Sequence, residues 1–399
     1  MPLLAITGVT GLLGRNLLLE TIKQNRKKLS ELKFVFFGRD SKKDNLKDRI
    51  IKILEEELKD YTDDESFDFE QIYGWFEQNV KLINYKLDVP QLGISIKDLE
   101  FLKKSKIDFF FHIAALTNLW HDEESKNQLE KANYFGTKYL VELVKELKNV
   151  GEFVYVGTAY SCGKTYGEIM PDYVNKGGHF RNNYERVKLE AELLVRDLEK
   201  ETGQKCRYFR PSVVCGRMIE KPFGAVSKFD VFYGWGVFFA QLKKKYVKNI
   251  ENFIEEECRI NLRYQISFDS GLNIVPVDYC AKIIYHCCFD NSPAKHVHLT
   301  YKQEIPHTFY FPLILKSLNI EGVVAVDELP ANQNFDEKLY YKSLGKVFNP
   351  YMTSQSMLFN IDNIKDIVEK NNIEVPDFLD SANFNILLNY AKKEKYGLN

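Results

Sequence analysis

A tyrosine and a lysine four residues apart carry the clearest chemistry in this sequence. Tyr184 and Lys188 fall in the run Tyr-Glu-Arg-Val-Lys, where the residue pattern predicts a helix over 183–200. Positions four apart share one face of a helix, so we expect the phenol and the ammonium to converge. The ammonium would lower the pKa of the phenol, which would then give or take a proton during hydride transfer. Thr158 follows the strand expected over 152–156 and would hold the substrate oxygen.

Three glycines near the start of the chain form the spacing G-x-x-G-x-x-G between an expected strand, residues 3–7, and an expected helix, residues 12–24. Glycines there permit a tight turn and let the backbone approach a pyrophosphate, while the helix N-terminus supplies N–H donors. The position of the turn therefore favours a dinucleotide site over an ordinary tight turn. The residues assigned to this site are Thr7, Gly8, Thr10, Gly11, Leu12, Leu13 and Gly14.

The end of the second expected strand bears on the choice of cofactor. A carboxylate at this point binds the ribose of NAD, and here the chain reads Gly38-Arg39-Asp40. Arg39 would stack on adenine and pair with a 2′-phosphate, so the sequence favours NADPH. Asp40 keeps NADH as the alternative, and the plainer interpretation is that both residues only end a strand.

The elements that position these residues follow an alternating order. Short β-branched and aromatic runs alternate with amphipathic helical stretches through the first half of the chain, which is typical of a parallel sheet covered by helices. We expect strands at 3–7, 33–38, 80–85, 107–113, 152–156 and 206–210, and helices at 12–24, 123–147 and 183–200. The predicted fold class is α/β, a Rossmann-type doubly wound parallel sheet.

A second, smaller α+β domain is expected after this sheet. The alternation ends near residue 215, and the rest of the chain predicts a mainly helical substrate-binding region over 216–399. The Rossmann domain is expected over 1–215 and should also receive roughly 272–300. An acidic and apolar insert at 42–79 predicts one or two exposed helices. Further expected elements are an aromatic segment at 222–250, a hairpin at 259–277 and helices at 305–317, 360–370 and 377–393.

Composition narrows the class of protein. The 399 residues carry 55 Lys+Arg against 56 Asp+Glu, a net charge of −1 that argues against nucleic acid as the main partner. No apolar run reaches the ~18 residues that a transmembrane helix needs, and the start lacks the pattern of a secretory signal.

The cysteines suggest a reducing compartment. Seven of them are scattered without C-x-x-C spacing, so we expect a cytoplasmic location. His286, Cys287 and Cys288 lie in an apolar helical pattern and are interpreted as core residues, and we predict no metal site.

With these motifs in order, the chain resembles the extended short-chain dehydrogenase/reductase superfamily over residues 1 to about 290. Besides the glycine turn, the matching segments are Leu87-Asp88-Val89, His112-Ile113-Ala114-Ala115, Asn133-Tyr134-Phe135-Gly136-Thr137, Arg210-Pro211-Ser212 and Val275-Pro276-Val277-Asp278. The resemblance implies that the cofactor is also contacted by Asp88, Val89, Ala114, Ala115, Asn133, Lys188, Pro211 and Ser212. It gives the catalytic roles to Thr158, Tyr184 and Lys188.

Within the superfamily, the chain looks most like the thioester reductase and fatty acyl-CoA reductase branch, also called the male-sterility type. The long insert, the phrase LDVPQLGISIKDLEFL before IDFFFHIAALTNL, and VGTAYSCGK indicate this branch. The resemblance implies NADPH-dependent reduction of an acyl thioester to an aldehyde, or onward to an alcohol. The acyl group would arrive on coenzyme A or on an acyl or peptidyl carrier protein, and a homodimer is plausible.

Two alternatives remain at this point. The same three catalytic residues would serve an enzyme acting on another carbonyl, either a ketone or aldehyde reductase or a nucleotide-sugar epimerase or dehydratase. A dinucleotide-binding protein without turnover is less favoured, because Thr158, Tyr184 and Lys188 are all present.

Overall fold

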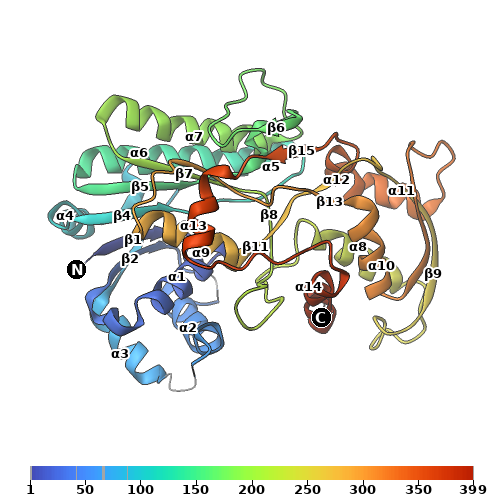
Figure 1. Ribbon diagram of the computed structural model, residues 1–399, viewed down its shortest axis with the longest axis horizontal. Helices are drawn as coiled ribbons and strands as arrows, with labels where there is room; N and C mark the ends of the chain where they lie inside the picture. Colours follow the sequence, from blue (N-terminus) through green and yellow to red (C-terminus); the bar gives the residue numbers. More distant parts are fainter. Residues whose placement is uncertain (1, 42, 65–67, 88, 399) are drawn as a thin grey trace.

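A seven-stranded parallel sheet forms the centre of the N-terminal part of the protein (Figure 1). The computed structural model describes residues 2–41, 43–64, 68–87 and 89–398. The strand order is β12-β7-β5-β4-β1-β2-β3, and every neighbouring pair is parallel. Bounds are β1 Leu3–Thr7, β2 Lys33–Gly38, β3 Val80–Asn84, β4 Ile107–His112, β5 Val150–Val156, β7 Cys206–Pro211 and β12 His296–Leu299. The order reverses at β1 and β4, which creates a crevice at the carboxyl ends of these strands.

Helices cover both faces of the sheet, which explains why its strands are almost continuously apolar. One face carries α1 (Leu12–Gln24) and α9 (Val277–Phe289), which pack on each other. The opposite face carries α4 (Ile96–Lys104), α6 (Gly136–Leu147) and α7 (Asn183–Thr202) (Figure 1). The predicted α/β fold class is thereby confirmed.

The predicted helix over 123–147 is interrupted. It consists of α5 (Glu123–Leu129), a π-helical turn at Glu130–Phe135, and α6. The predicted helices at 12–24 and 183–200 correspond to α1 and α7 with matching starts.

The insert after β2 forms two helices, α2 (Leu46–Thr62) and α3 (Phe69–Asn79). We expected exposed helices, and for α2 this is wrong. Leu46, Ile50, Leu54 and Leu58 recur every four residues and form a fully buried stripe. A stripe with this period faces one direction on a helix, so α2 belongs to the core beneath the sheet.

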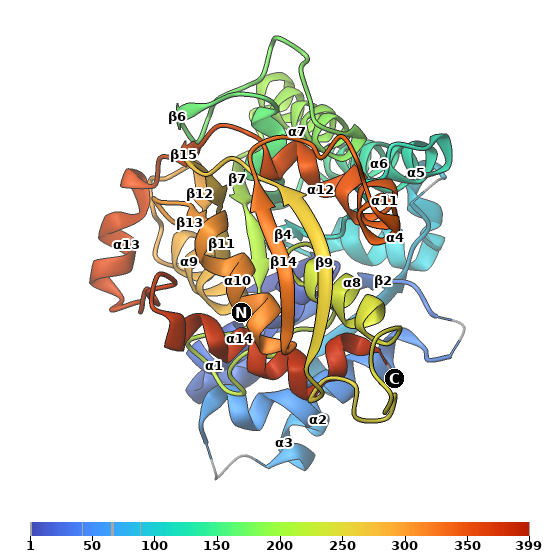
Figure 2. The same ribbon diagram turned by 90° about the vertical axis from the view of Figure 1, so that its right-hand side faces the viewer.

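The remaining elements surround a separate hydrophobic cluster. Figure 2 shows two long strands, β9 (Cys258–Gln265) and β14 (Ile320–Val326), side by side in front of the helices of this region. The helices of this region are α8 Tyr233–Lys243, α10 His307–Ser317, α11 Phe335–Lys342, α12 Leu344–Met352 and α14 Ser381–Lys393, whereas α13 Lys365–Lys370 packs on α9 of the sheet domain. Short strands pair as β8 Val213–Cys215 with β11 Ile274–Pro276, β10 Gly271–Leu272 with β13 Ile305–Pro306, and β6 Gly167–Ile169 with β15 Met357–Phe359.

The expected hairpin at 259–277 is wrong. β9 pairs in parallel with β14, and β10 pairs antiparallel with β13. The strand that pairs with β9 lies more than 50 residues later in the chain, and a local pattern of alternating residues cannot identify it. Residues 277–299 return to the sheet as α9 and β12. The domain boundaries proposed from the sequence remain a prediction.

All seven cysteines are free, and both Cys287 and Cys288 are buried within α9. Across the described ranges, no group of three or more His, Cys, Asp or Glu side chains is arranged to hold a metal ion. None of the helices in the described part of the chain has the length and apolar composition needed to cross a membrane.

A buried ion pair fixes α7 to the sheet. Arg210 on β7 donates from Nε and Nη2 to the two oxygens of Glu192 at 3.0 and 2.8 Å, and both side chains are fully buried. Burial alone would raise the pKa of Glu192, but Arg210 holds it below its usual value. Glu192 lies four and eight residues after Lys188 and Tyr184, so the pair anchors the helical face that carries them.

We expect Arg210→Met to destabilise the protein by about 3 kcal/mol, because the buried Glu192 carboxylate loses its bond to the sheet and keeps Arg196, on its own helix, as its cationic partner. Chemical denaturation would measure the loss. As a matched control, Arg186→Met removes an arginine from half-exposed pairs with Glu190 and Glu130 and should cost about 1 kcal/mol or less. Equal losses for the two variants would contradict the anchoring role.

Candidate active site

A cleft of about 1000 Å³ opens at the carboxyl ends of the central strands and reaches the second hydrophobic region. Its walls include the loops that follow β1, β2, β4, β5 and β7, the first turns of α1 and α7, and parts of α8 and α12. The predicted site residues that line it are Gly8, Thr10, Gly11, Leu12, Leu13, Gly14, Arg39, Ala114, Ala115, Thr158, Tyr184, Lys188, Pro211 and Ser212.

The glycine turn is closely packed against neighbouring backbone. Gly8 has φ +77°, and a Cβ there would lie 2.7 Å from the backbone nitrogen of Ala114. A Cβ on Gly14 would lie 2.1 Å from the carbonyl oxygen of Gly8. Gly11 is the N-cap of α1 and has no side chain, so it makes no capping hydrogen bond with the first N–H groups of the helix. Bare backbone and helix N–H donors at the cleft wall fit the pyrophosphate of a dinucleotide.

Three predicted cofactor residues do not line the cleft, and two of them shape its wall from behind. Thr7 Oγ1 accepts hydrogen bonds from the backbone nitrogens of Ile113 and Ala114, both at 3.2 Å. Asn133 accepts from the nitrogen of Leu116 at 2.7 Å and donates to its oxygen at 2.9 Å. Together they hold the loop after β4 in place.

The third of these residues, Val89, is half-buried in the turn before α4, where its oxygen accepts from the nitrogen of Leu92 at 3.0 Å. Asp88 lies outside the described residues. The cofactor contacts assigned to Thr7, Asp88, Val89 and Asn133 therefore remain predictions.

Tyr184 is half-buried at the start of α7, where the hydroxyls of Thr158 and Thr117 hydrogen-bond with it. Burial raises its pKa to about 12, although both threonines act in the opposite direction. The expected lowering of this pKa by the lysine is thus wrong. Lys188 instead donates to the oxygen of Val156 at 2.9 Å, and its ammonium lies 4.8 Å from the centre of the Tyr155 ring. Tyr184 therefore remains protonated at neutral pH and is suited to donate a proton.

Lys188 is 3% exposed, and burial lowers its pKa to about 8, with Glu192 acting against that shift. A lowered pKa of a cation means that the charge is lost as the pH rises through the lowered value, so Lys188 is charged below about pH 8. Thr158 is also buried, and its hydroxyl donates to the oxygen of Pro211 at 3.3 Å.

Thr117 and Arg49 are among the polar residues of the cleft that sequence reasoning missed. Thr117 lies two positions beyond Ala115 in the loop after β4. Its closeness in sequence to the predicted cofactor residues was the one sign that it could line the cleft. Arg49 on α2 also lines the cleft, and its guanidinium donates to the carbonyl oxygen of Arg39 at 2.5 Å. The two arginines are ten positions apart in sequence, and no local pattern links them.

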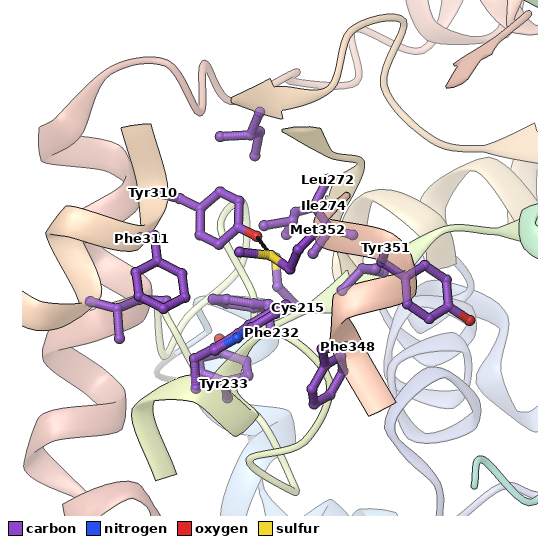
Figure 3. Close-up of a cluster of buried hydrophobic side chains, with 14 of the residues drawn as sticks. Cys215, Phe232, Tyr233, Leu272, Ile274, Tyr310, Phe311, Phe348, Tyr351 and Met352 are labelled. Carbon is purple, nitrogen blue, oxygen red and sulfur yellow. Dashed lines mark hydrogen bonds between the residues drawn. The ribbon is translucent and has the colours of Figure 1, made fainter. Parts of the chain in front are cut away.

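The far wall of the cleft is apolar and comes from the second region. It includes Trp235, Leu272, Phe348 and Tyr351. Figure 3 shows three of these beside Phe232, Tyr233 and other core side chains. The aromatic segment at 229–242 contributes to both the cleft and the core, because Trp235 lines the cleft while Phe239 packs in the core.

Comparison with known proteins identifies the family. A family model described as male sterility protein matches residues 6–284. The chain belongs to the male sterility protein family. Among curated relatives, fatty acyl-CoA reductase 1 of Pongo abelii is 23% identical, with 96% of this chain and 79% of that protein covered. Fatty acyl-CoA reductase 1 of Rattus norvegicus is 29% identical over 162 residues, covering 40% of this chain and 29% of that protein.

Solved structures share the fold of this male sterility family member. The terminal R domain from the myxalamid PKS-NRPS biosynthetic pathway has a TM-score of 0.71 and 19% identity, covering 99% of this chain and 92% of that one. A thiolation-reductase di-domain from an archaeal non-ribosomal peptide synthetase has a TM-score of 0.63 and 18% identity, covering 99% and 91%. UDP-glucuronic acid 4-epimerase from Bacillus cereus in complex with NAD has a TM-score of 0.59 and 12% identity, covering 98% and 97%.

The family and the fold together define the class of this protein. It is an NAD(P)-dependent oxidoreductase of the extended short-chain dehydrogenase/reductase type. The glycine turn and the cleft fit its nicotinamide dinucleotide cofactor.

We expect Gly14→Ala to weaken dinucleotide binding about tenfold or more. The added Cβ would clash with the backbone of Gly8, and shifting the turn to accommodate it costs about 1–3 kcal/mol. Isothermal titration of the purified variant would measure the loss. Gly74→Ala is the matched control, because a Cβ at Gly74 on α3 meets nothing within 4 Å. Unchanged affinity in Gly14→Ala would contradict the placement of the pyrophosphate at this turn.

Proposed function

We propose that this protein is an NADPH-dependent reductase of acyl thioesters, which it converts to aldehydes. The observation that carries the proposal is the protonated Tyr184 hydroxyl beside Thr158, placed between the glycine turn and an apolar wall in one cleft. The relatives named fatty acyl-CoA reductase 1 support a thioester substrate.

Each residue has a defined part in this proposal. Bound NADPH would supply the hydride. The hydroxyls of Tyr184 and Thr158 would bind the carbonyl oxygen and stabilise the negative charge that develops on it. Tyr184 would then give its proton to that oxygen, which its high pKa allows at neutral pH. Lys188, charged below about pH 8, would hold the cofactor ribose and favour the tyrosinate left behind.

The product of this first step is a hemithioacetal, which collapses to release the thiol and the aldehyde. A second hydride and proton would convert the aldehyde to an alcohol in the same site. The apolar wall around Trp235, Leu272 and Phe348 would bind the acyl group and exclude water.

The proposal covers delivery of the acyl group by coenzyme A or by a carrier protein. The fatty acyl-CoA reductase relatives favour coenzyme A, whereas the structural neighbour described as a thiolation-reductase di-domain favours a carrier. A homodimer and a cytoplasmic location remain predictions.

The first experiment follows the loss of reduced-nicotinamide absorbance with a panel of acyl-CoA and carrier-bound thioesters, aldehydes and ketones. We expect Tyr184→Phe to lower kcat by about 10²–10⁴-fold, the usual contribution of a positioned proton donor. Retained NADPH affinity in the variant would show that the site is intact.

Two outcomes would contradict the proposal. Wild-type turnover that depends on Tyr184 with ketones but not with thioesters would assign a simpler carbonyl reductase. Tightly bound NAD with no net consumption would favour the chemistry of the epimerase neighbour instead.

Cofactor choice is a separate part of the proposal. Arg39 and Arg49 both line the cleft near the end of β2, where the adenine ribose of a dinucleotide lies in this fold. Two guanidinium groups suit a 2′-phosphate, because they form charge-assisted hydrogen bonds with it.

We expect Arg39→Ala and Arg49→Ala each to raise the KM for NADPH about 10–100-fold and to leave that for NADH nearly unchanged. Steady-state kinetics with both cofactors would measure the ratio. Lys47→Ala is the control, since Lys47 also lies on α2 but pairs with Glu77. An equal effect on both cofactors would remove the argument for NADPH.

A further inference from the structure

Tyr351 joins the second hydrophobic region to the helix that carries Tyr184. It stands at the end of α12, is 7% exposed, and lines the cleft with its ring. Figure 3 shows its ring pointing away from the cluster of Phe232, Tyr233 and Tyr310, with the hydroxyl at the far end. The side chain therefore leaves its own region and reaches another one.

The hydroxyl of Tyr351 meets the first turn of α7. It donates to Oε1 of Glu185 at 2.8 Å and accepts from Nδ2 of Asn182 at 2.6 Å. Asn182 is the N-cap of the helix, and its Oδ1 accepts from the nitrogen of Glu185 at 3.0 Å. Tyr184 lies between these two residues in sequence, so the Tyr351 hydroxyl holds the turn that carries it on both sides.

Besides Tyr351, the Glu185 carboxylate is bound by Arg181. The carboxylate is fully buried and accepts from the backbone nitrogen of Arg181 at 2.9 Å. The Arg181 guanidinium lies 3.4 Å from the other carboxylate oxygen and also donates to the oxygen of Gly163 at 2.6 Å. The same guanidinium lies 5.3 Å from the centre of the Tyr351 ring. Glu185, Arg181 and Asn182 are all buried, so the loss of one hydrogen-bond donor in this group is costly.

Tyr351 also contacts the segment that carries the other catalytic hydroxyl. Its ring packs edge-on against Tyr160 at 5.5 Å between centroids. The backbone nitrogen of Tyr160 donates to Oγ1 of Thr158 at 3.3 Å. One side chain from α12 thus touches the turn bearing Tyr184 and the turn bearing Thr158.

We propose that Tyr351 is a positioning residue that sets the placement of Tyr184 relative to Thr158, so that docking of α12 against α7 is a condition of turnover. The contacts of one hydroxyl and one ring carry this role. The kinetic part of its test rests on the proposed reductase function.

The test uses Tyr351→Phe, which keeps the ring against Tyr160 and removes only the hydroxyl. We expect kcat to fall about 10–100-fold, as for a reacting group displaced by about 1 Å. The affinity for NADPH should stay at its wild-type value, because Tyr351 touches none of the glycine turn. In a Tyr184→Phe background, Tyr351→Phe should have no further effect on kcat.

The matched control is Tyr310→Phe. It removes a buried hydroxyl from the same region, where it bonds His307 at 2.9 Å and the sulfur of Met352 on α12 at 3.4 Å. We expect a similar loss of thermal stability and an unchanged kcat. Wild-type kcat in Tyr351→Phe, an equal fall in Tyr310→Phe, or a further fall on top of Tyr184→Phe would each overturn the proposal.

A second readout keeps this test separate from the proposed function. Amide hydrogen exchange of the ligand-free protein should become faster at residues 181–186 in Tyr351→Phe but not in Tyr310→Phe. If the wild type reduces no thioester, the proposed function fails, and the exchange comparison alone decides the role of Tyr351. Unchanged exchange at 181–186 would overturn that role.

Discussion

The buried ion pair between Glu192 and Arg210 is the interaction on which the catalytic geometry depends. A carboxylate and a guanidinium taken out of water are stable only together, so they allow one position of α7 against the sheet. Tyr184 and Lys188 lie on that same helical face and are brought to the cleft by it. A structural pair therefore determines where the proton donor stands.

The opposite wall of the cleft depends on the absence of side chains. At Gly8 and Gly14 the backbone of α1 approaches neighbouring backbone more closely than any Cβ permits. The N–H groups of the first helical turn are consequently open to a ligand. The cleft thus combines one wall positioned by a buried ion pair with another shaped by close backbone packing.

Local patterns in the sequence predicted six strands of the seven-stranded sheet, all but β12, and most of the predicted site residues line the cleft. The strands at 3–7 and 33–38, the glycine turn and the face of α7 each depend on neighbours within a few residues, and each is where the pattern predicts. The errors have a common cause. β9 pairs with β14 across a long stretch of chain, which a run of alternating residues cannot specify.

The same reasoning explains the polar residues that were missed. Arg49 and Tyr351 reach the cleft from distant segments, and neither belongs to a motif. The raised pKa of Tyr184 depends on burial, which the sequence does not give. Likewise, no sequence pattern identifies the oxygen of Val156 as the acceptor for the Lys188 ammonium.

The insert after β2 has a consequence for how this protein can vary. Glu57 on α2 pairs with Arg15, just beyond the glycine turn, at 2.9 Å. Glu57 also bonds Arg217, a fully buried residue that in turn donates to Asn16 at 2.7 Å. Adding or deleting one residue within α2 before Glu57 would rotate that side chain by about 100° around the helix, away from both arginines. The first helix of the insert is therefore tied by its side chains to the helix that follows the glycine turn, and the two helices form one structural unit beside the cleft.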